Sequence, residues 1–395
     1  MITQHISRHR EQQGLKMSNA AFNVRNRHFD KLVSNHDLKW LGQNTNHFSP
    51  HPSVIEAMHA SIAAEEFHIY APPAGLEELR ALIVEDLDLK DMQALVSDGA
   101  VASLYHVCHT FLAAGDEFIT TDPTWNWPMR FAESVGATVK QIPIYGDEYS
   151  YRLAPERLAA AMTDKTRVIY LVDPNNPIGS CCTEDEIREI ARIAREAGAI
   201  LIHDATYRHF AFDHTLAARF YPEGTITIYS FSKWLGMAGA RVGAVVACED
   251  IVAKLAVSPP NNLGSNIMSQ RAAIAGLKSR LEWFPSVLSQ TRANQEIVKV
   301  AVDAVEGLRI PVYPSNGNFL VIECDEAGLT PAGLVEAYRQ EGIMVRQGAY
   351  HTVTFGDRFI KVSVSVPEEW VREFADLLPE MVIRASTSKT TATAF

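Results

Sequence analysis

The chain has 395 residues, 47% hydrophobic and 21% charged, which is an ordinary composition for a globular protein of about two or three domains. The formal net charge of −11 argues against nucleic-acid binding, and no apolar stretch approaches the roughly 18 residues that span a membrane. Five cysteines, with Cys181 and Cys182 adjacent, indicate neither a disulfide framework nor metal ligands, so we expect reduced thiols in a cytoplasmic protein.

The composition along the chain predicts two domains with flexible ends. Residues 1–20 are polar and lack the apolar centre of a signal peptide, and residues 387–395 are of low complexity. We expect a large domain over 65–299, which includes an interdomain helix, and a small domain formed by 21–64 and 300–386.

Two short motifs in the first third of the chain are typical of ligand sites, although neither is specific. The turn "SDGAVAS", around Gly99, precedes a predicted helix, and small residues there expose backbone N–H groups that can bind a phosphate. Such turns are also common without a ligand. The segment "DPTWNWP" places Trp125 where it either stacks on a planar ligand or packs in the core.

The middle of the chain alternates between strand and helix patterns. The apolar runs "RVIYLVD" and "AILIHD" flank "TEDEIREIARIAREAG", which combines capping-box spacing at Thr183 and Glu186 with one apolar face. A third apolar run, "TITIYS", follows. This order predicts an α/β fold with a mostly parallel central sheet and helices on both faces. In such sheets ligands bind beyond the carboxyl ends of the strands, where Asn176, Asp204 and Ser230 lie.

Lys233, in "SFSKWLGMAGARVG", is the strongest candidate for a catalytic residue. Burial and a neighbouring positive charge lower the pKa of a lysine, and the neutral amine then forms a Schiff base with an aldehyde. Arg241 supplies that charge and is also suited to binding a phosphate dianion. A lone lysine in a loop is usually only solvated, and it is the combination with Arg241 and with the hydroxyl of Ser230 that favours catalysis.

Three further polar residues have both a structural and a functional interpretation. Asp204 ends a strand and is either a turn residue or a carboxylate that keeps a heteroaromatic nitrogen protonated. Tyr207 and Asn176 are within reach of the same ring, but Asn176 also fits a plain Asn-Pro turn.

After a long helical stretch at 266–305, the pattern changes to that of a small α+β domain. The strand-like segments are "NFLVIEC", "GIMVRQG" and "RFIKVSVSV", and "PAGLVEAYRQEG" between them is helical.

From about residue 35 to 385 the chain resembles the class I and II aminotransferases, which are pyridoxal-phosphate enzymes of fold type I. The resemblance rests on "YAPPAGLEELR", "DPTWNWP", "DPNNPIG", "HDATY" and "SFSKWLGMAGARVG". It implies a homodimer with shared active sites, a small amino substrate and the following roles. Lys233 is the Schiff-base lysine, Asp204 pairs with the pyridine nitrogen, and Asn176 and Tyr207 hold the ring oxygen. Trp125 stacks on the ring, and the phosphate is bound by Ser230, Arg241, the backbone of Gly99, Ala100 and Val101, and Tyr70 of the neighbouring subunit.

The chain departs from the family pattern where the substrate carboxylate binds. Lys361, in "FIKVSVS", replaces the usual arginine, which is either a tolerated exchange or a sign of an unusual substrate. Asn44, in the amide-rich "WLGQNTNHF", either reads a polar substrate or belongs to a turn, and Arg346 is the other cation assigned to the substrate. We therefore expect an aminotransferase for a small polar amino acid or amine. The alternative is a decarboxylase, an eliminating enzyme or a carbon–carbon bond-forming synthase that uses the same cofactor.

Overall fold

The computed structural model describes residues 19–257, 259–261, 263–388 and 390. The predicted flexible ends lie mostly outside this part of the chain, which begins with helix α2 (Asn19–Val33) and continues to helix α12 (Glu368–Thr387). Among the described residues, no helix is both long and apolar enough to cross a membrane.

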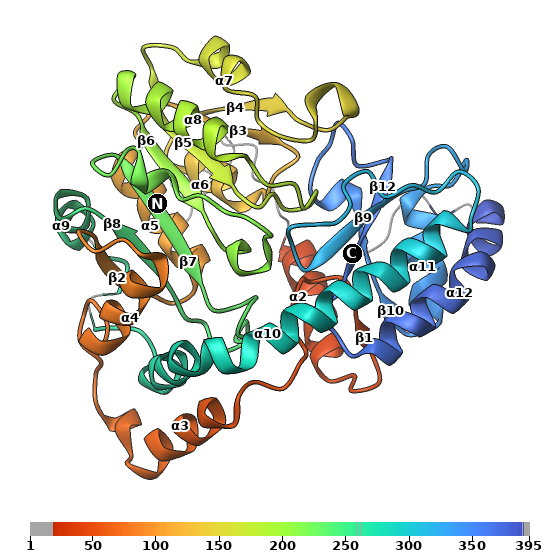
Figure 1. Cartoon of the computed structure of the whole chain (residues 1–395), viewed down its shortest axis with the longest axis horizontal. Coiled ribbons are helices and arrows are strands. Elements are labelled where there is room, and N and C mark those ends of the chain that lie inside the picture. The colour runs from red at the N-terminus through yellow and green to blue at the C-terminus, as the bar shows by residue number, and fades with distance from the viewer. Residues whose placement is uncertain (1–18, 258, 262, 389, 391–395) are drawn as a thin grey trace.

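A seven-stranded sheet forms the larger half of the molecule (Figure 1), with the strand order β2-β8-β7-β6-β5-β3-β4. The contacts between β7, β6, β5, β3 and β4 are parallel, whereas β8 is antiparallel to both of its neighbours. The predicted fold class, a mostly parallel sheet with helices, is confirmed. The strands are β2 (Gln93–Ser97), β3 (Glu117–Asp122), β4 (Thr138–Pro143), β5 (Thr166–Val172), β6 (Ile200–Asp204), β7 (Thr225–Ser230) and β8 (Gly243–Ala247).

Helices pack on both faces of this sheet because its central strands carry apolar side chains on both sides. Ile169 and Leu171 of β5 pack with Ile187 of α8, whereas Val168 and Tyr170 belong to a second core on the opposite face. Helix α8 begins with the predicted capping box, in which Thr183 and Glu186 bond each other's backbone N–H groups. The helices of this half are α4 (Glu77–Leu87), α5 (Ala100–Phe111), α6 (Trp127–Ser134), α7 (Pro155–Ala161), α8 (Glu184–Glu196) and α9 (Glu249–Val257).

The carboxy-terminal half contains two smaller sheets covered by helices. Strands β11 (Arg346–Gln347), β12 (Phe359–Ser363) and β9 (Phe319–Glu323) form an antiparallel sheet, and β1 (Lys39–Trp40) pairs in parallel with β10 (Ile343–Met344). The amino-terminal segment thus joins the carboxy-terminal half through β1. Helices α11 (Pro331–Gln340) and α12 pack together over this region.

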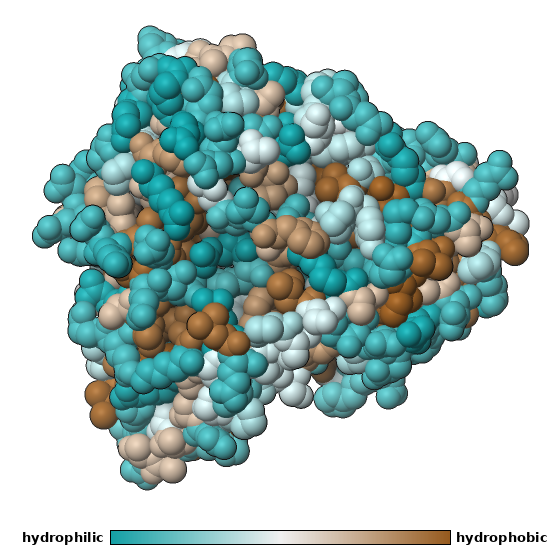
Figure 2. Space-filling view, in the orientation of Figure 1, coloured by the Kyte–Doolittle hydropathy of each residue, from teal (hydrophilic) through white to brown (hydrophobic). Residues whose placement is uncertain are grey.

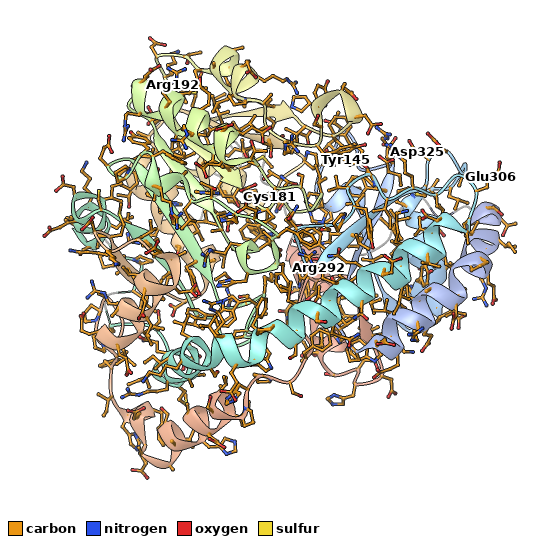
Figure 3. The ribbon with its side chains drawn as sticks, viewed as in Figure 1. Tyr145, Cys181, Arg192, Arg292, Glu306 and Asp325 are labelled. Carbon is orange, nitrogen blue, oxygen red and sulfur yellow. The ribbon has the colours of Figure 1, made fainter. Side chains whose placement is uncertain are left out.

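Helix α10 (Ile267–Asp303) connects the two halves (Figure 1). Its 37 residues span about 55 Å, so its first half packs in the core of the large sheet and Val298 and Val302 pack in the core of the small one. Near its middle, Arg292 donates to the carbonyl oxygens of Phe210 and Ser315, one from each half (Figure 3). These contacts fix the relative position of the two sheets.

The predicted division at residue 64 stays a prediction, although one contact bears on it. Helix α3 (Pro52–Ala63) packs against α10, and its Val54 lies in the core of the large sheet. The chain therefore passes from the small half to the large half before residue 64. The surface seen in Figure 2 is mainly hydrophilic, with apolar groups in scattered patches.

A buried carboxylate, Asp86 of α4, ties three other elements together. It accepts hydrogen bonds from Arg208, Tyr229 and His209, and Arg280 of α10 lies 2.7 Å from its second oxygen. Burial alone would raise the pKa of this carboxyl, but the hydrogen bond from His209 and the arginine charges hold it well below its usual range.

We predict that Asp86→Asn lowers the free energy of unfolding by about 3 kcal/mol, because it leaves the partly buried Arg208 and Arg280 without their counter-charge. Urea unfolding followed by tryptophan fluorescence measures this change. Asp88→Asn is the matched control, because Asp88 is exposed and its ion pair with Arg219 is 3.4 Å long, and it should cost less than about 0.5 kcal/mol. Similar losses in the two variants would contradict the prediction.

Candidate active site

A cavity of about 850 Å³ lies at the carboxyl ends of the central strands, between the two halves of the molecule. Its lining contains four basic residues, Lys233, Arg241, Arg346 and Lys361, and among the described residues that line it the one carboxylate belongs to Asp204. The cavity is thus strongly positive in a protein whose net charge is −11. Such a site suits a ligand with more than one anionic group.

The order of the strands brings the predicted residues together. Asp204 ends β6 and is the register partner of Val172 in β5 and of Ile228 in β7. Asn176 follows β5, and Ser230 ends β7. Because β5, β6 and β7 are parallel neighbours, the three side chains meet at one edge of the sheet, as the sequence predicts.

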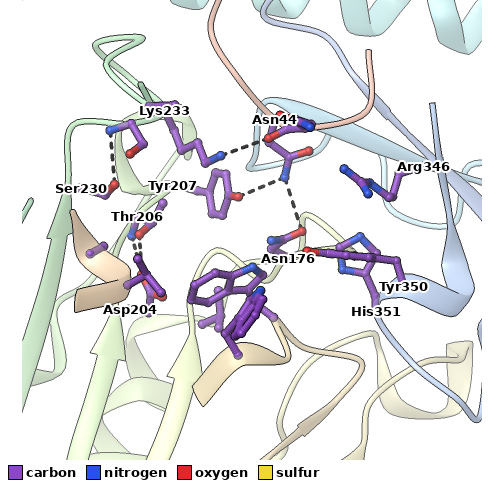
Figure 4. Close-up of a pocket in the computed structure, with 18 of the residues that line it drawn as sticks. Asn44, Asn176, Asp204, Thr206, Tyr207, Ser230, Lys233, Arg346, Tyr350 and His351 are labelled. Atoms are coloured by element: carbon purple, nitrogen blue, oxygen red, sulfur yellow. Dashed lines mark hydrogen bonds between the residues drawn. The ribbon is translucent and has the colours of Figure 1, made fainter. Parts of the chain in front are cut away.

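Lys233 lies in the connection between the antiparallel strands β7 and β8. Its Nζ donates to the carbonyl oxygen of Gln43 at 3.1 Å (Figure 4). Burial, together with the charges of Arg241 and Arg346, lowers the pKa of this amine to about 8. About a tenth of the amine is therefore neutral, and hence nucleophilic, at pH 7, far more than for an ordinary lysine.

An anion-binding cradle lies at the start of helix α5. The helix begins at Ala100 without a side-chain cap, so its first N–H groups are available to a ligand. Arg241 lies against Gly99, where an added Cβ would come within 2.3 Å of the guanidinium, and its own φ is +53°. Arg241 donates to the carbonyl oxygens of Asp98 and Ala238, and no carboxylate among the described residues pairs with it. The cradle fits a phosphate.

Asp204 is a buried carboxylate held by three donors. Its Oδ1 accepts from the backbone N–H and the hydroxyl of Thr206, and its Oδ2 accepts from the hydroxyl of Tyr170 at 2.9 Å. Burial nevertheless raises the pKa of Asp204, because these neutral donors do not compensate the lost solvation. A cationic N–H group of a ligand would supply the missing compensation, so the site fits a protonated ring nitrogen.

Asn44, Asn176 and Tyr207 form a hydrogen-bonded group on the other side of the cavity (Figure 4). The side-chain nitrogen of Asn44 donates to the hydroxyl oxygen of Tyr207 at 3.0 Å and to Oδ1 of Asn176 at 3.4 Å. Trp125, Ala100 and Val101 also line the cavity. Asn44 is therefore no plain turn residue, although its φ of +55° is typical of one.

The end of the cavity formed by the small sheet contains two buried cations. Arg346 of β11 and Lys361 of β12 are register partners, and 5% and 3% of their surfaces are exposed. Burial and the charges of Arg346 and Lys233 lower the pKa of Lys361 well below its usual value. Its Nζ lies over the ring of Phe319, and no described residue forms a hydrogen bond or ion pair with it.

Two predicted residues differ in position from the others. Gly99 packs against Arg241 rather than lining the cavity, and Tyr70 is 76% exposed and lies outside it. The predicted contact of Tyr70 with a neighbouring subunit stays a prediction.

Several residues in or next to the cavity were not predicted. Thr206, two positions after Asp204, has a local signal, because a hydroxyl at this spacing often bonds an aspartate. Tyr170 reaches Asp204 only through strand pairing, and buried His351 enters the cavity from a loop, so no local pattern identifies them. Neither ring nitrogen of His351 has a hydrogen-bond partner in the described part of the chain.

A second cluster of polar residues, Asp173, His203 and His214, lies beneath the site. His203 Nδ1 accepts the backbone N–H of Ala217, so the proton of the neutral ring is on Nε2 and faces Asp173 at 3.7 Å. A protonated Nε2 cannot ligate a metal. Asp173 also accepts the backbone N–H of Cys182, so the cluster holds the turn that carries Asn176.

Comparisons with known proteins agree with this geometry. The family model described as "Aminotransferase class I and II" matches residues 36–378. The chain is 29% identical to histidinol-phosphate aminotransferase of Methanocaldococcus jannaschii, over 88% of this chain and 90% of that protein. It is 26% identical to aspartate/prephenate aminotransferase of Thermus thermophilus, over 80% and 84% of the two chains.

Among solved structures, aspartate aminotransferase from Thermus thermophilus with maleate has a TM-score of 0.79 at 22% identity, covering 94% of this chain and 98% of that one. At this identity the likeness shows the fold alone. The family match over most of the length carries the assignment. The chain belongs to the class I and II aminotransferases and is a pyridoxal-phosphate-dependent enzyme.

Proposed function

We propose that this enzyme transfers the amino group of a small polar substrate that also carries an anionic group bound by Arg346 and Lys361. The observation that carries the proposal is the buried amine of Lys361 at the far end of the cavity, which lies in register beside Arg346 and has no hydrogen bond or ion pair with a described residue. A buried ammonium group requires a polar partner, and an anionic substrate would supply it. The relatives named above are aminotransferases, which favours transamination over decarboxylation, elimination or carbon–carbon bond formation.

The residues around the cavity fit the cofactor as a set. The start of α5, Arg241 and Ser230 would bind its phosphate, and Asp204 would accept the ring N–H. Asn176 and Tyr207 would donate to the ring oxygen, with Trp125 against the ring face. When bound, pyridoxal phosphate supplies an electron sink for the pair of electrons left on the substrate Cα.

Lys233 would have two tasks, which its lowered pKa supports. It would hold the cofactor covalently before the substrate arrives. Once the substrate amine has displaced it, the neutral Nζ would take the proton from the substrate Cα and return it to the adjacent cofactor carbon. Its hydrogen bond to the carbonyl oxygen of Gln43 would orient the amine between these positions.

The substrate end of the cavity would select an anion through Arg346 and Lys361. The lowered pKa of Lys361 means that its positive charge is costly without an anion nearby, and a bound anion would stabilise the protonated amine. The guanidinium of Arg346 beside it is suited to two parallel hydrogen bonds with a carboxylate or phosphate. Buried, uncharged His351 lies beside them and offers a neutral ring nitrogen.

We further propose that the enzyme is a homodimer with shared sites. Tyr70, Ile69 and Phe67 are 76%, 63% and 52% exposed and lie in one short segment beyond helix α3. An exposed group of large apolar side chains is typical of a subunit interface, which supports a second copy of this chain as the partner.

To test transamination, the holoenzyme is mixed with an amino donor and no keto-acid acceptor. We expect one equivalent of keto product per active site, and continuous turnover only when a keto acid is added. Release of carbon dioxide, or turnover without an acceptor, would contradict transamination.

The choice of substrate is tested with pairs that differ by one anionic group, namely histidinol phosphate against histidinol and aspartate against β-alanine, which lacks the α-carboxylate. We expect at least a tenfold higher kcat/KM for the anionic member of one pair, which also decides between a phosphate and a carboxylate. Equal values within both pairs would overturn the proposed role of Arg346 and Lys361.

We predict that covalent attachment of the cofactor to the apoenzyme accelerates with rising pH, with a midpoint near 8, because the neutral Lys233 amine attacks. Stopped-flow absorbance gives the rate, and borohydride reduction with peptide mapping gives the position. Arg346→Gln should raise the midpoint, because the Arg346 charge helps to lower the pKa, and Lys39→Gln at the surface should not change it. A label on another lysine would refute the assignment.

We predict that Lys361→Met raises KM for the anionic substrate by about tenfold to a hundredfold, because the variant loses one charge-assisted hydrogen bond to the substrate. In the wild type KM should rise with pH as Lys361 loses its proton, and Lys361→Arg should abolish that dependence because a guanidinium keeps its charge. Lys39→Met is the control, since Lys39 pairs with Glu373 outside the cavity. An unchanged pH dependence in the arginine variant would contradict the prediction.

A further inference from the structure

Asn44, for which the sequence predicts a substrate contact, donates to Asn176 and Tyr207. We propose that Asn44 is a positioning residue that fixes the donor direction of Asn176 and Tyr207, so that both direct a hydrogen toward the phenolic ring oxygen of the cofactor. The inference rests on the proposed roles of Lys233, Asn176 and Tyr207. Asn44 itself is 1% exposed.

The direction of the Asn44 amide is set by Ser363 of β12. The Ser363 hydroxyl oxygen accepts the backbone N–H of Asn44 at 2.7 Å, and its proton goes to Oδ1 of Asn44 at 3.2 Å. With Oδ1 engaged, the side-chain nitrogen of Asn44 faces the cavity. Asn318 donates to the backbone carbonyl oxygen of Asn44 at 3.0 Å. Hydrogen bonds to both the N–H and the carbonyl group therefore hold the left-handed backbone of Asn44 in place.

The orientation of Asn44 determines what its two partners can donate. Oδ1 of Asn176 accepts from Asn44, so the amide nitrogen of Asn176 is turned away from Asn44, and no described residue accepts from it. The hydroxyl oxygen of Tyr207 accepts from the same nitrogen at 3.0 Å, which leaves the Tyr207 proton available. Both partners line the cavity (Figure 4). An acceptor at position 44 would reverse both directions, because it would attract the Tyr207 proton and the Asn176 nitrogen.

The small half of the molecule thereby acts on the cofactor site without touching the cofactor. Ser363 and Asn318 belong to or flank the small sheet, whereas Asn176 and Tyr207 follow strands of the large one. Donors to the ring oxygen stabilise its anionic form, so their number controls the pH at which the covalently bound cofactor loses its proton.

The test is the pH midpoint of the visible absorption band of the bound cofactor, measured on the holoenzyme. In Asn44→Asp, whose side chain has the same size but accepts instead of donating, the midpoint should rise by about one pH unit or more. Asn44→Gly keeps the positive φ and adds no charge, and it should raise the midpoint by less. Ser363→Ala, which frees the Asn44 amide to rotate, should also raise it.

Ser279→Ala is the matched control, because Ser279 is also buried but donates to the backbone oxygen of Ala275 within α10, away from Asn44 and its partners. It should leave the midpoint unchanged. A rise in Asn44→Asp alone would be a charge effect and would overturn the inference, as would a changed KM with unchanged midpoints in every variant. A wild-type enzyme without a pH-dependent band would instead overturn the proposed role of Lys233.

Discussion

The concentration of positive charge in one buried cavity is the constraint on which the rest of this structure depends. Among the described residues, four basic side chains and one carboxylate line this space, in a chain with eleven more acidic than basic residues. Such charges repel one another, and their burial costs free energy unless anions compensate them. The pKa values of Lys233 and Lys361 are lowered because burial and neighbouring positive charges disfavour the protonated amines. The cofactor phosphate and an anionic substrate would lower this free-energy cost when they bind.

Elements of secondary structure hold the positively charged groups of the cavity in place. Helix α5 contributes uncapped N–H groups, and the connection between the antiparallel strands β7 and β8 contributes both Lys233 and Arg241. Because β8 returns beside β7 without a crossover helix, that connection stays at the carboxyl edge of the sheet. Its close approach to α5 requires glycine at position 243, where a Cβ would lie 2.6 Å from the backbone nitrogen of Ala100.

The substrate end belongs to a different sheet, so its position depends on how the two halves are joined. Helix α10 packs in both cores, and Arg292 bonds backbone carbonyls from each half. Asn44 adds a polar link inside the cavity itself, from Ser363 to Tyr207. Through these connections the cations of the small sheet and the ring-binding residues of the large sheet face a common space.

The sequence by itself determined the parts of this protein that depend on local pattern. Continuous apolar runs, the capping box at Thr183 and the polar residues after successive strands were enough to predict a mostly parallel sheet and to place Asn176, Asp204 and Ser230 at one edge. The motif around Lys233 predicted a reactive lysine, because its neighbours in the chain are also its neighbours in space.

Only the tertiary structure decided the contacts that join distant segments. Tyr170 meets Asp204 through strand pairing, and Lys361 lies beside Arg346 because β11 and β12 are register partners. Asn44 reaches Ser363 and Tyr207 across 319 and 163 residues of sequence. The direction of a hydrogen bond and the loss of solvation depend on every group packed around an atom. No local pattern of residues contains that information, so the tuning of the site emerged only when the chain was folded.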